Sequence, residues 1–345
     1  SIGFAESLVM PAPTTTATKS NVLSQKKVIV VGGGPVGLYF AALMLHKDPT
    51  VRIEILEKST KKSTNAFGLG ISSRMQNRLS DVPGLKEKLL ESTVDLPSLG
   101  VPMISRDDLS EQMKYFLEER QPSCQMQYGT SCESVDFEKK QVTTNDGSIM
   151  DYDLLVAADG VNSKIRQQLV TNCGFQEERY LQDVSWKALS MPKQPEIENG
   201  SFKPLQHPSL TGGRVLPKAP EGHILLLLWK GIKNNNPKDI ETTDDFKAMI
   251  TDAMQDKYRK IDIVRKISGF GISDDVKKDR EIVFDDIALK DCFDSRAGRV
   301  QYLRTSQYHY EDSVALIGDS AHCFNSLLGQ GCATGLESTH TLVES

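Results

Sequence analysis

Short apolar runs alternate with glycine-rich turns at both ends of the chain. Val28–Val31 is a β-branched run that predicts a buried parallel strand, Leu38–His46 predicts an apolar helix face, and Val51–Leu56 predicts a second strand. Leu154–Ala158 and Val314–Ile317 are two more runs of the buried-strand type. Strands of this type separated by helices indicate an α/β fold built on a parallel sheet.

The middle of the chain has a different pattern. Asp107–Glu119 opens with Asp and is rich in Leu, Met, Lys and Glu, which predicts a helix. Gln141–Thr144 and Ser148–Tyr152 flank the turn sequence Asn145-Asp-Gly147, which predicts a hairpin.

From about residue 180 to 300, prolines and glycines separate short strands. Ile224–Trp229 reads as a buried strand, and Asp244–Tyr258 predicts a helix. We therefore expect an α/β domain with a parallel sheet, formed by residues 28–180 and 305–345, and an inserted, mainly antiparallel β-sheet domain over 181–304. Residues 1–27 are rich in Thr and Ser and lack helical periodicity, which favours a disordered leader or the remnant of a targeting segment.

Composition narrows the class of protein. The 345 residues are 39% hydrophobic and 25% charged, with a formal net charge of -5, so there is no electrostatic case for nucleic acid. No apolar run approaches the roughly 18 residues that a transmembrane segment needs. The six cysteines form no CxxC pair and have no metal-ligand spacing with the six histidines, which favours a reduced intracellular compartment, cytoplasmic or organellar, and no bound metal.

The first chemical motif follows the first strand. Gly32-x-Gly34-x-x-Gly37 lies between that strand and a helix, where glycines permit a tight turn and the approach of a pyrophosphate to the helix N-terminus. Glu57 ends the second strand about 20 residues later, placed to accept a hydrogen bond from a ribose. The sequence thus predicts a dinucleotide site, whose candidate contacts also include Pro35 and Lys58.

Two later motifs favour FAD over NAD. Asp159-Gly160-x-x-Ser163-x-x-Arg166 and Gly318-Asp319 each follow a predicted strand, and the carboxyl ends of parallel strands converge on the ligand. Asp319 can accept hydrogen bonds from the cofactor's hydroxyls. Gly329-Gln330-Gly331 allows close approach to a flat ring and starts a helix near Cys332, whose N–H groups would stabilise a negatively charged reduced flavin.

These three motifs, in this order, resemble those of the group A flavoprotein monooxygenases, which share the aromatic-ring hydroxylase fold. The resemblance covers roughly residues 26–345, and Leu69–Arg74 and Ile104–Leu109 are most similar to the kynurenine 3-monooxygenases. The resemblance implies that residues 28–180 and 305–345 form a Rossmann-like FAD-binding domain and that 181–304 form the substrate-binding domain. It also implies that the FAD site is lined by Val36, Glu57, Arg106, Asp319, Cys332 and Ala333.

The resemblance implies an activity as well. NADPH or NADH would reduce FAD, and O2 would form a flavin hydroperoxide that hydroxylates a small aromatic substrate. No catalytic side chain is assigned. The alternatives are a non-hydroxylating FAD oxidoreductase of the same fold, or a truncated flavin-binding protein without turnover.

Several positions depart from the family pattern. Asn325-Ser326 replace a usual proline, Ala333 replaces a usual Asn, and Asn65 stands where an arginine is found in kynurenine hydroxylases. The segment from Ser92 to Ile104 is short, and the chain stops at Ser345 within the last predicted helix.

Some single residues remained open between roles. Arg166 could pair with Asp159 or approach a cofactor phosphate, and Arg74 could contact flavin or face solvent. His322 is interpreted as a non-catalytic part of the family's sequence stretch, and Cys323 and Cys332 as small packing residues, with a redox disulfide as the alternative for the two cysteines. Trp186 and Trp229 were interpreted as core of the inserted sheet, though either could line the pocket.

Overall fold

The fold is described from a computed structural model of the chain. The description covers residues 26–60, 68–96, 100–194, 197, 203–218, 222–255, 281–324 and 329–345.

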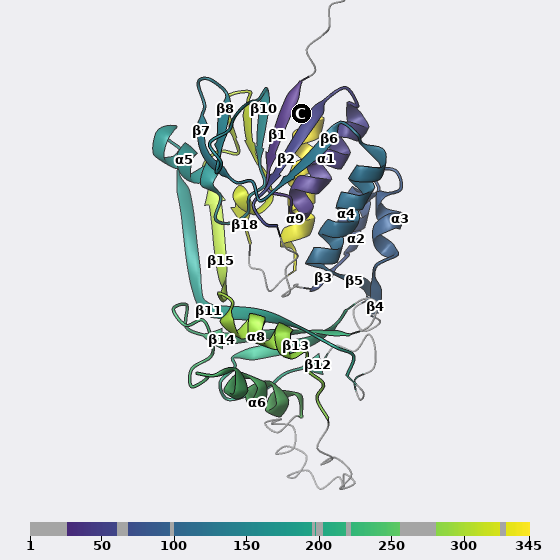
Figure 1. The fold of residues 1–345 in the computed structure, drawn as a ribbon, viewed down its shortest axis with the longest axis vertical. Coiled ribbons are helices and arrows are strands. Elements are labelled where there is room, and N and C mark those ends of the chain that lie inside the picture. The colour runs from purple at the N-terminus through teal and green to yellow at the C-terminus, as the bar shows by residue number, and fades with distance from the viewer. Residues whose placement is uncertain are drawn as a thin grey trace, which may run out of the picture.

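A six-stranded sheet forms the upper body in Figure 1. Its order is β16–β17–β10–β1–β2–β6, with all neighbours parallel except the antiparallel edge pair β16–β17. The strands are β1 (Lys27–Val31), β2 (Arg52–Glu57), β6 (Cys124–Tyr128), β10 (Leu154–Ala157), β16 (His309–Tyr310) and β17 (Val314–Leu316). The predicted parallel sheet is confirmed.

Both faces of this sheet are covered, which explains its uninterrupted apolar strands. Val28 and Val30 point into a helix-side core, whereas Ile29 and Val31 point into the opposite core. The helix layer comprises α1 (Pro35–Lys47), α2 (Ser73–Leu79), α3 (Leu85–Leu90), α4 (Arg106–Arg120) and α9 (Gly331–Glu344). The other face carries α5 (Lys164–Asn172) and a small sheet of β7 (Cys132–Asp136), β8 (Gln141–Thr144) and β9 (Ile149–Asp151). The predicted hairpin is the antiparallel pair β8–β9.

A second six-stranded sheet forms the lower body, in the order β12–β13–β14–β11–β15–β18, with antiparallel neighbours throughout. It contains β11 (Glu177–Met191), β12 (Lys203–Pro204), β13 (Gly212–Pro217), β14 (His223–Lys230), β15 (Gly298–Thr305) and β18 (His322–Cys323). The expected antiparallel region is therefore confirmed. Its far face packs on α6 (Thr243–Met254) and α8 (Asp286–Asp294), and α8 was not predicted.

The two bodies meet at two places. A three-stranded sheet, β3 (Gly68–Gly70), β4 (Val94–Leu96) and β5 (Val101–Ser105), lies at the lower end of the helix layer. A methyl group on Gly68 would lie 3.4 Å from both Leu216 and Ile224 of the second sheet. The long strands β11 and β15 form the second link, as Figure 1 shows.

Within the described part of the chain, no helix has the length and apolarity that crossing a bilayer requires.

Candidate cofactor site

The turn after β1 contains glycines that the fold itself requires. Gly32 has a φ of +110°, and a Cβ there would lie 2.3 Å from the carbonyl oxygen of Ala158. A Cβ on Gly37 would lie 2.2 Å from the carbonyl oxygen of Gly32. These two glycines therefore let α1 approach the ends of β1 and β10.

Gly34 is different, because no residue in the described part of the chain demands a glycine there. Its φ of −78° suits any residue. A Cβ on Gly34 would meet only the Nη2 atom of Arg106, at an ordinary contact distance of 3.7 Å. The bare backbone at Gly34 thus borders space that a ligand can occupy.

The side chain of Glu57 stabilises the same turn through hydrogen bonds. One oxygen of its carboxylate accepts the N–H of Gly33 at 2.8 Å, and the other accepts the N–H of Ser59, also at 2.8 Å. Each oxygen has a further lone pair, so Glu57 can still accept a hydrogen bond from a ligand hydroxyl. Lys58 follows directly and is exposed.

Two helices of the site begin without a capping side chain. The N-cap residue of α1 is Gly34, which has no side chain, and the side chain of Gln330 does not cap α9. Helix α3 also begins at a glycine, Gly84, without a side-chain cap. Side chains cap the other described helices α2, α4, α5, α6 and α8, namely those of Ser72, Ser105, Ser163, Thr242 and Asp285.

The first N–H groups of a helix have no partner within it and favour an anion or a ligand acceptor. In α9 these belong to Gly331, Cys332 and Ala333, since the first intrahelical bond is from Thr334 to Gln330. The methyl group of Ala333 is buried in the helix-side core, so its N–H is the group available to a ligand.

Asp319 faces the start of α9. It lies in the short 3₁₀ turn η2 (Gly318–Ser320) after β17, and a Cβ on Gly331 would lie 3.7 Å from its Oδ1. The side chain is exposed, yet enough protein surrounds it that burial raises the pKa of Asp319 against the opposing pull of Arg106 and His322. The carboxylate is therefore reachable but poorly hydrated, which suits a ligand with hydroxyl donors.

The motif after β10 presents a second carboxylate. Asp159 Oδ2 accepts the N–H of Lys164 at 2.8 Å, while its Oδ1 is buried and has no hydrogen-bond partner among the described residues. Burial raises the pKa of Asp159 despite hydrogen bonds from Ser163 and Lys164. Gly160 beside it has a φ of +78° and borders open space.

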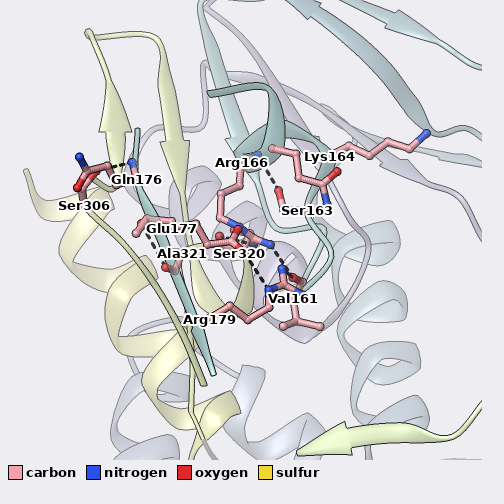
Figure 2. A network of polar contacts seen from close by, with 12 residues as sticks. Val161, Ser163, Lys164, Arg166, Gln176, Glu177, Arg179, Ser306, Ser320 and Ala321 are labelled. Atoms are coloured by element: carbon pink, nitrogen blue, oxygen red, sulfur yellow. Dashed lines mark hydrogen bonds and ion pairs between the residues drawn. The ribbon is translucent and has the colours of Figure 1, made fainter. Parts of the chain in front are cut away.

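Arg166 takes neither of the two roles considered from the sequence. Its side chain is completely buried, and Figure 2 shows it bridging segments far apart in the chain. The guanidinium donates to the carboxylate of Glu177 at 2.7 Å and to the carbonyl oxygens of Ser320 at 2.8 Å and Val161 at 2.6 Å. Arg166 therefore joins the loop after Asp159 to the turn that holds Asp319.

Arg74 is exposed, as the solvent-facing alternative expected, but it is also held by partners on α9. Its guanidinium binds both carboxylate oxygens of Glu337 on α9, with Nε at 2.9 Å from Oε1. It also donates to Oε1 of Gln330 at 2.9 Å. Arg74 thus holds the Gly329-Gln330-Gly331 segment and the helix that follows it.

The remaining glycines of the site have structural reasons of their own. Gly318 has a φ of +57°, and a Cβ there would lie 3.1 Å from Val36 on α1. Gly329 has a φ of +64° and borders open space. Pro35 is the first residue of α1, where a missing N–H costs nothing.

The side chains interpreted as non-catalytic or as packing residues do pack. The ring of His322 lies near Tyr308 and Phe324, and burial lowers its pKa, so the neutral form is favoured. Burial raises the pKa of the Cys323 and Cys332 thiols to about 12, which keeps both protonated at neutral pH. All six cysteines lie in described segments, and all are free thiols.

The two tryptophans lie on opposite faces of the second sheet. Trp229 is buried in the core beneath α6 and α8. Trp186 is half-buried on the other face, beside Ala188, Leu216 and Ile224.

The structure thus brings Gly34, Arg106, Asp319 and Gly331 to one end of the parallel sheet, with the Asp159 loop joined to them through Arg166. The sequence alone did not indicate the roles of Arg74, Arg166 and Glu177. The departures at Asn65, Asn325 and Ser326 lie outside the described residues.

Comparison with known proteins agrees with this geometry. The chain is 22% identical to kynurenine 3-monooxygenase of Dictyostelium discoideum over 349 residues, covering 92% of this chain and 69% of that protein. It is 22% identical to the Drosophila melanogaster kynurenine 3-monooxygenase, covering 96% of this chain and 72% of that protein. The FAD-dependent monooxygenase phomE of Diaporthe leptostromiformis is 24% identical, over 69% of this chain and 60% of phomE. The chain is a homologue of FAD-dependent monooxygenases. No protein-family profile matches it.

Solved structures show that the FAD-dependent hydroxylase fold is shared. The tetrameric form of 2-methyl-3-hydroxypyridine-5-carboxylic acid oxygenase superposes with a TM-score of 0.64 at 18% identity, over 93% of this chain and 82% of that one. PqsL of Pseudomonas aeruginosa, a probable FAD-dependent monooxygenase, gives 0.61 at 17% identity, over 93% and 85%. The predicted resemblance and fold class are confirmed.

Proposed function

We propose that this FAD-dependent monooxygenase homologue uses NADPH or NADH and O2 to hydroxylate a small aromatic substrate. The observation that carries the proposal is the pair of uncapped helix N-termini at Gly34 and Gly331, with Arg106 and Asp319 beside them. A methyl group at either glycine would make only ordinary protein contacts, so the bare backbone is explained best by a bound cofactor.

Each part of the site suits one part of FAD. The start of α1 would hold the pyrophosphate, with Glu57 accepting from the ribose and Arg106 supplying positive charge. Asp319 and the Asp159–Gly160 loop would hold the linker between pyrophosphate and ring. The N–H groups of Gly331, Cys332 and Ala333 would lie against the ring, where a helix N-terminus stabilises negative charge. When bound, the flavin supplies the redox chemistry, and the protein supplies position and exclusion of water.

The substrate side has a suitable surface. Trp186, Ala188, Leu216 and Ile224 form an apolar patch on the face of the second sheet opposite to α6 and α8; Trp186 is half-buried there and the other three are buried. Gly68 of β3 contacts this patch from the flavin-site side. Apolar and aromatic side chains of this kind suit a small aromatic molecule.

The test is reduction followed by turnover. The FAD-loaded protein is mixed with NADPH or NADH under anaerobic conditions, and the flavin absorbance is followed. A panel of small aromatic compounds is then added with O2, and hydroxylated product and hydrogen peroxide are measured together. Flavin bleaching with substrate-dependent product is the expected result.

Other outcomes identify the alternatives. Reduction without any hydroxylated product across the panel would favour a non-hydroxylating oxidoreductase. Bound flavin that neither reductant bleaches, with or without the aromatic compounds, would favour a flavin-binding protein without turnover.

A further inference from the structure

The strand pair β11–β15 links the second sheet to the flavin-site body. Glu177–Leu181 pairs with Gln301–Thr305, the register then shifts, and pairing resumes at Ser185 and Trp186. Only the part of β11 from Val184 onward also pairs with β14. In this upper part, called the ribbon below, β11 pairs only with β15 among the described strands, while β15 also pairs with the short strand β18 (Figure 1). A register shift of this kind bends the strands that carry it.

The flavin-site end of this ribbon is held by a carboxylate between two arginines. Glu177 Oε2 accepts from Arg166 Nε at 2.7 Å, and its Oε1 accepts from Arg179 Nε at 2.8 Å. Arg179 also donates to the carbonyl oxygen of Val161 at 3.1 Å, so both arginines hold the same loop (Figure 2).

The second strand of the ribbon is attached to the Asp319 turn. The hydroxyl of Thr305 on β15 donates mainly to the carbonyl oxygen of Gln307 at 2.8 Å and lies 3.3 Å from the carbonyl oxygen of Ala321. The chain continues from there into His322 and Cys323, which pair with Arg304 and Leu303 of β15. The turn that holds Asp319 is thus continuous with the edge strand of the second sheet.

Glu177 is charged in this setting. Burial would raise its pKa, but the hydrogen bonds and charges of Arg166 and Arg179 lower it overall. Because a guanidinium is planar and rigid, a shift of the carboxylate also displaces the bonds that Arg166 makes to Val161 and Ser320. Glu177 therefore links the ribbon, through Arg166, to the loop after Asp159 and to the turn that holds Asp319.

We propose that Glu177 is a positioning residue, which acts through Arg166 to fix the substrate-side sheet relative to the flavin. The inference rests on the flavin binding of the proposed function. It goes further because it assigns the relative position of cofactor and substrate to one carboxylate, that of Glu177, which is not among the predicted cofactor contacts.

Tryptophan fluorescence can report the position of the second sheet relative to bound FAD. Its only two tryptophans, Trp186 and Trp229, both lie in the second sheet. Tryptophan emission overlaps flavin absorption, so the quenching of tryptophan fluorescence by bound FAD depends on the distance and orientation between this sheet and the flavin.

The experiment compares Glu177→Gln with wild type and with Glu178→Gln as the matched control. Glu178 is the next residue, is exposed, and pairs only with the exposed Arg304 at 2.8 Å among the described contacts. Each protein is titrated with FAD while tryptophan lifetime and flavin absorbance are recorded.

We expect Glu177→Gln to bind one FAD with Kd raised about tenfold, the effect of one charge-assisted hydrogen bond. We also expect its tryptophan lifetime with FAD bound to differ from that of wild type, while Glu178→Gln matches wild type. A merely stabilising role would lower the unfolding midpoint without changing the lifetime of the loaded protein.

Equal lifetimes in Glu177→Gln and wild type, both loaded with FAD, would overturn the inference. If Glu177→Gln does not fold, Arg179→Gln is tested instead. It removes one of the two guanidinium groups that bind the Glu177 carboxylate, and its tryptophan lifetime is compared with that of wild type in the same way. Absence of FAD binding by the wild-type protein would instead refute the proposed function, and the inference with it.

Discussion

Replacing Gly34 by alanine separates a glycine kept for a ligand from one kept for the fold. The backbone at Gly34 has a φ of −78°, and the new Cβ would meet only Arg106 Nη2, at 3.7 Å. Alanine is a poorer N-cap than glycine by about 1 kcal/mol, but it lowers the entropy of the unfolded chain by about 0.4–1 kcal/mol. The free energy of unfolding of the apoprotein should therefore change by less than about 1 kcal/mol.

The effect on binding should be much larger. The methyl group would occupy the space assigned to the pyrophosphate, and forcing an extra carbon into a packed contact costs about 1–3 kcal/mol. That corresponds to a Kd for FAD about 5- to 150-fold higher.

Gly37→Ala gives the opposite pattern. Its Cβ at 2.2 Å from the Gly32 oxygen falls 1.2 Å short of the ordinary contact distance of 3.4 Å (3.4 − 2.2), so the fold itself must shift.

Urea unfolding of the apoproteins and fluorescence titration with FAD measure the two quantities separately. Gly34→Ala should keep the wild-type unfolding midpoint and lose affinity, whereas Gly37→Ala should lose stability first. A Gly34→Ala protein that binds FAD as tightly as wild type would refute the assignment of this backbone to the cofactor.

Three further predictions concern the surroundings of the site. Arg74→Met should raise the Kd for FAD several-fold, because it frees Gln330 and Glu337. Lys47→Met should not, because Lys47 lies on α1 and pairs with Glu344 at the far end of α9. Gly335→Ala should destabilise the apoprotein by about 1–3 kcal/mol in urea, since its Cβ would lie 2.5 Å from Val36. His223 is fully buried, and burial lowers its pKa, so the unfolded chain takes up a proton below about pH 6.5 when the folded chain does not. Stability should therefore fall as the pH drops from 7.5 to 5.5, and less steeply in His223→Leu.

Each of these has a contrary result. Equal Kd values for Arg74→Met and Lys47→Met would remove the role of Arg74 in holding the ring segment. An unchanged midpoint in Gly335→Ala would mean that α1 and α9 separate without cost. Identical pH slopes in wild type and His223→Leu would show that His223 is protonated in the folded protein or that other groups dominate.

The local parts of the fold were predictable because local chemistry determines them. The β-branched run Val28–Val31, the glycines after it and the turn Asn145-Asp-Gly147 each specify their own backbone, and the structure has the predicted strand, helix and hairpin there. Helix α8 was missed although Asp285 provides a capping signal, accepting from the N–H groups of Ile287 and Ala288.

The long-range parts were not predictable from one sequence. Arg166 binds Ser320, 154 residues away, and Arg74 binds Glu337, 263 residues away. Nothing in the local sequence around either arginine indicates its partner, because only the folded sheet brings those segments together. For the same reason, the glycine motifs predict one end of the sheet as the cofactor site but do not show which glycines serve packing and which border open space.

Flavin binding by this chain is measured by the visible absorbance spectrum of the purified protein after incubation with FAD and removal of free cofactor. We expect a retained flavin spectrum, shifted from that of free FAD, with about one flavin per chain in wild type and much less in Gly34→Ala. A folded wild-type chain that emerges colourless would contradict this expectation, because the uncapped helices and bare glycine backbone would then hold no flavin.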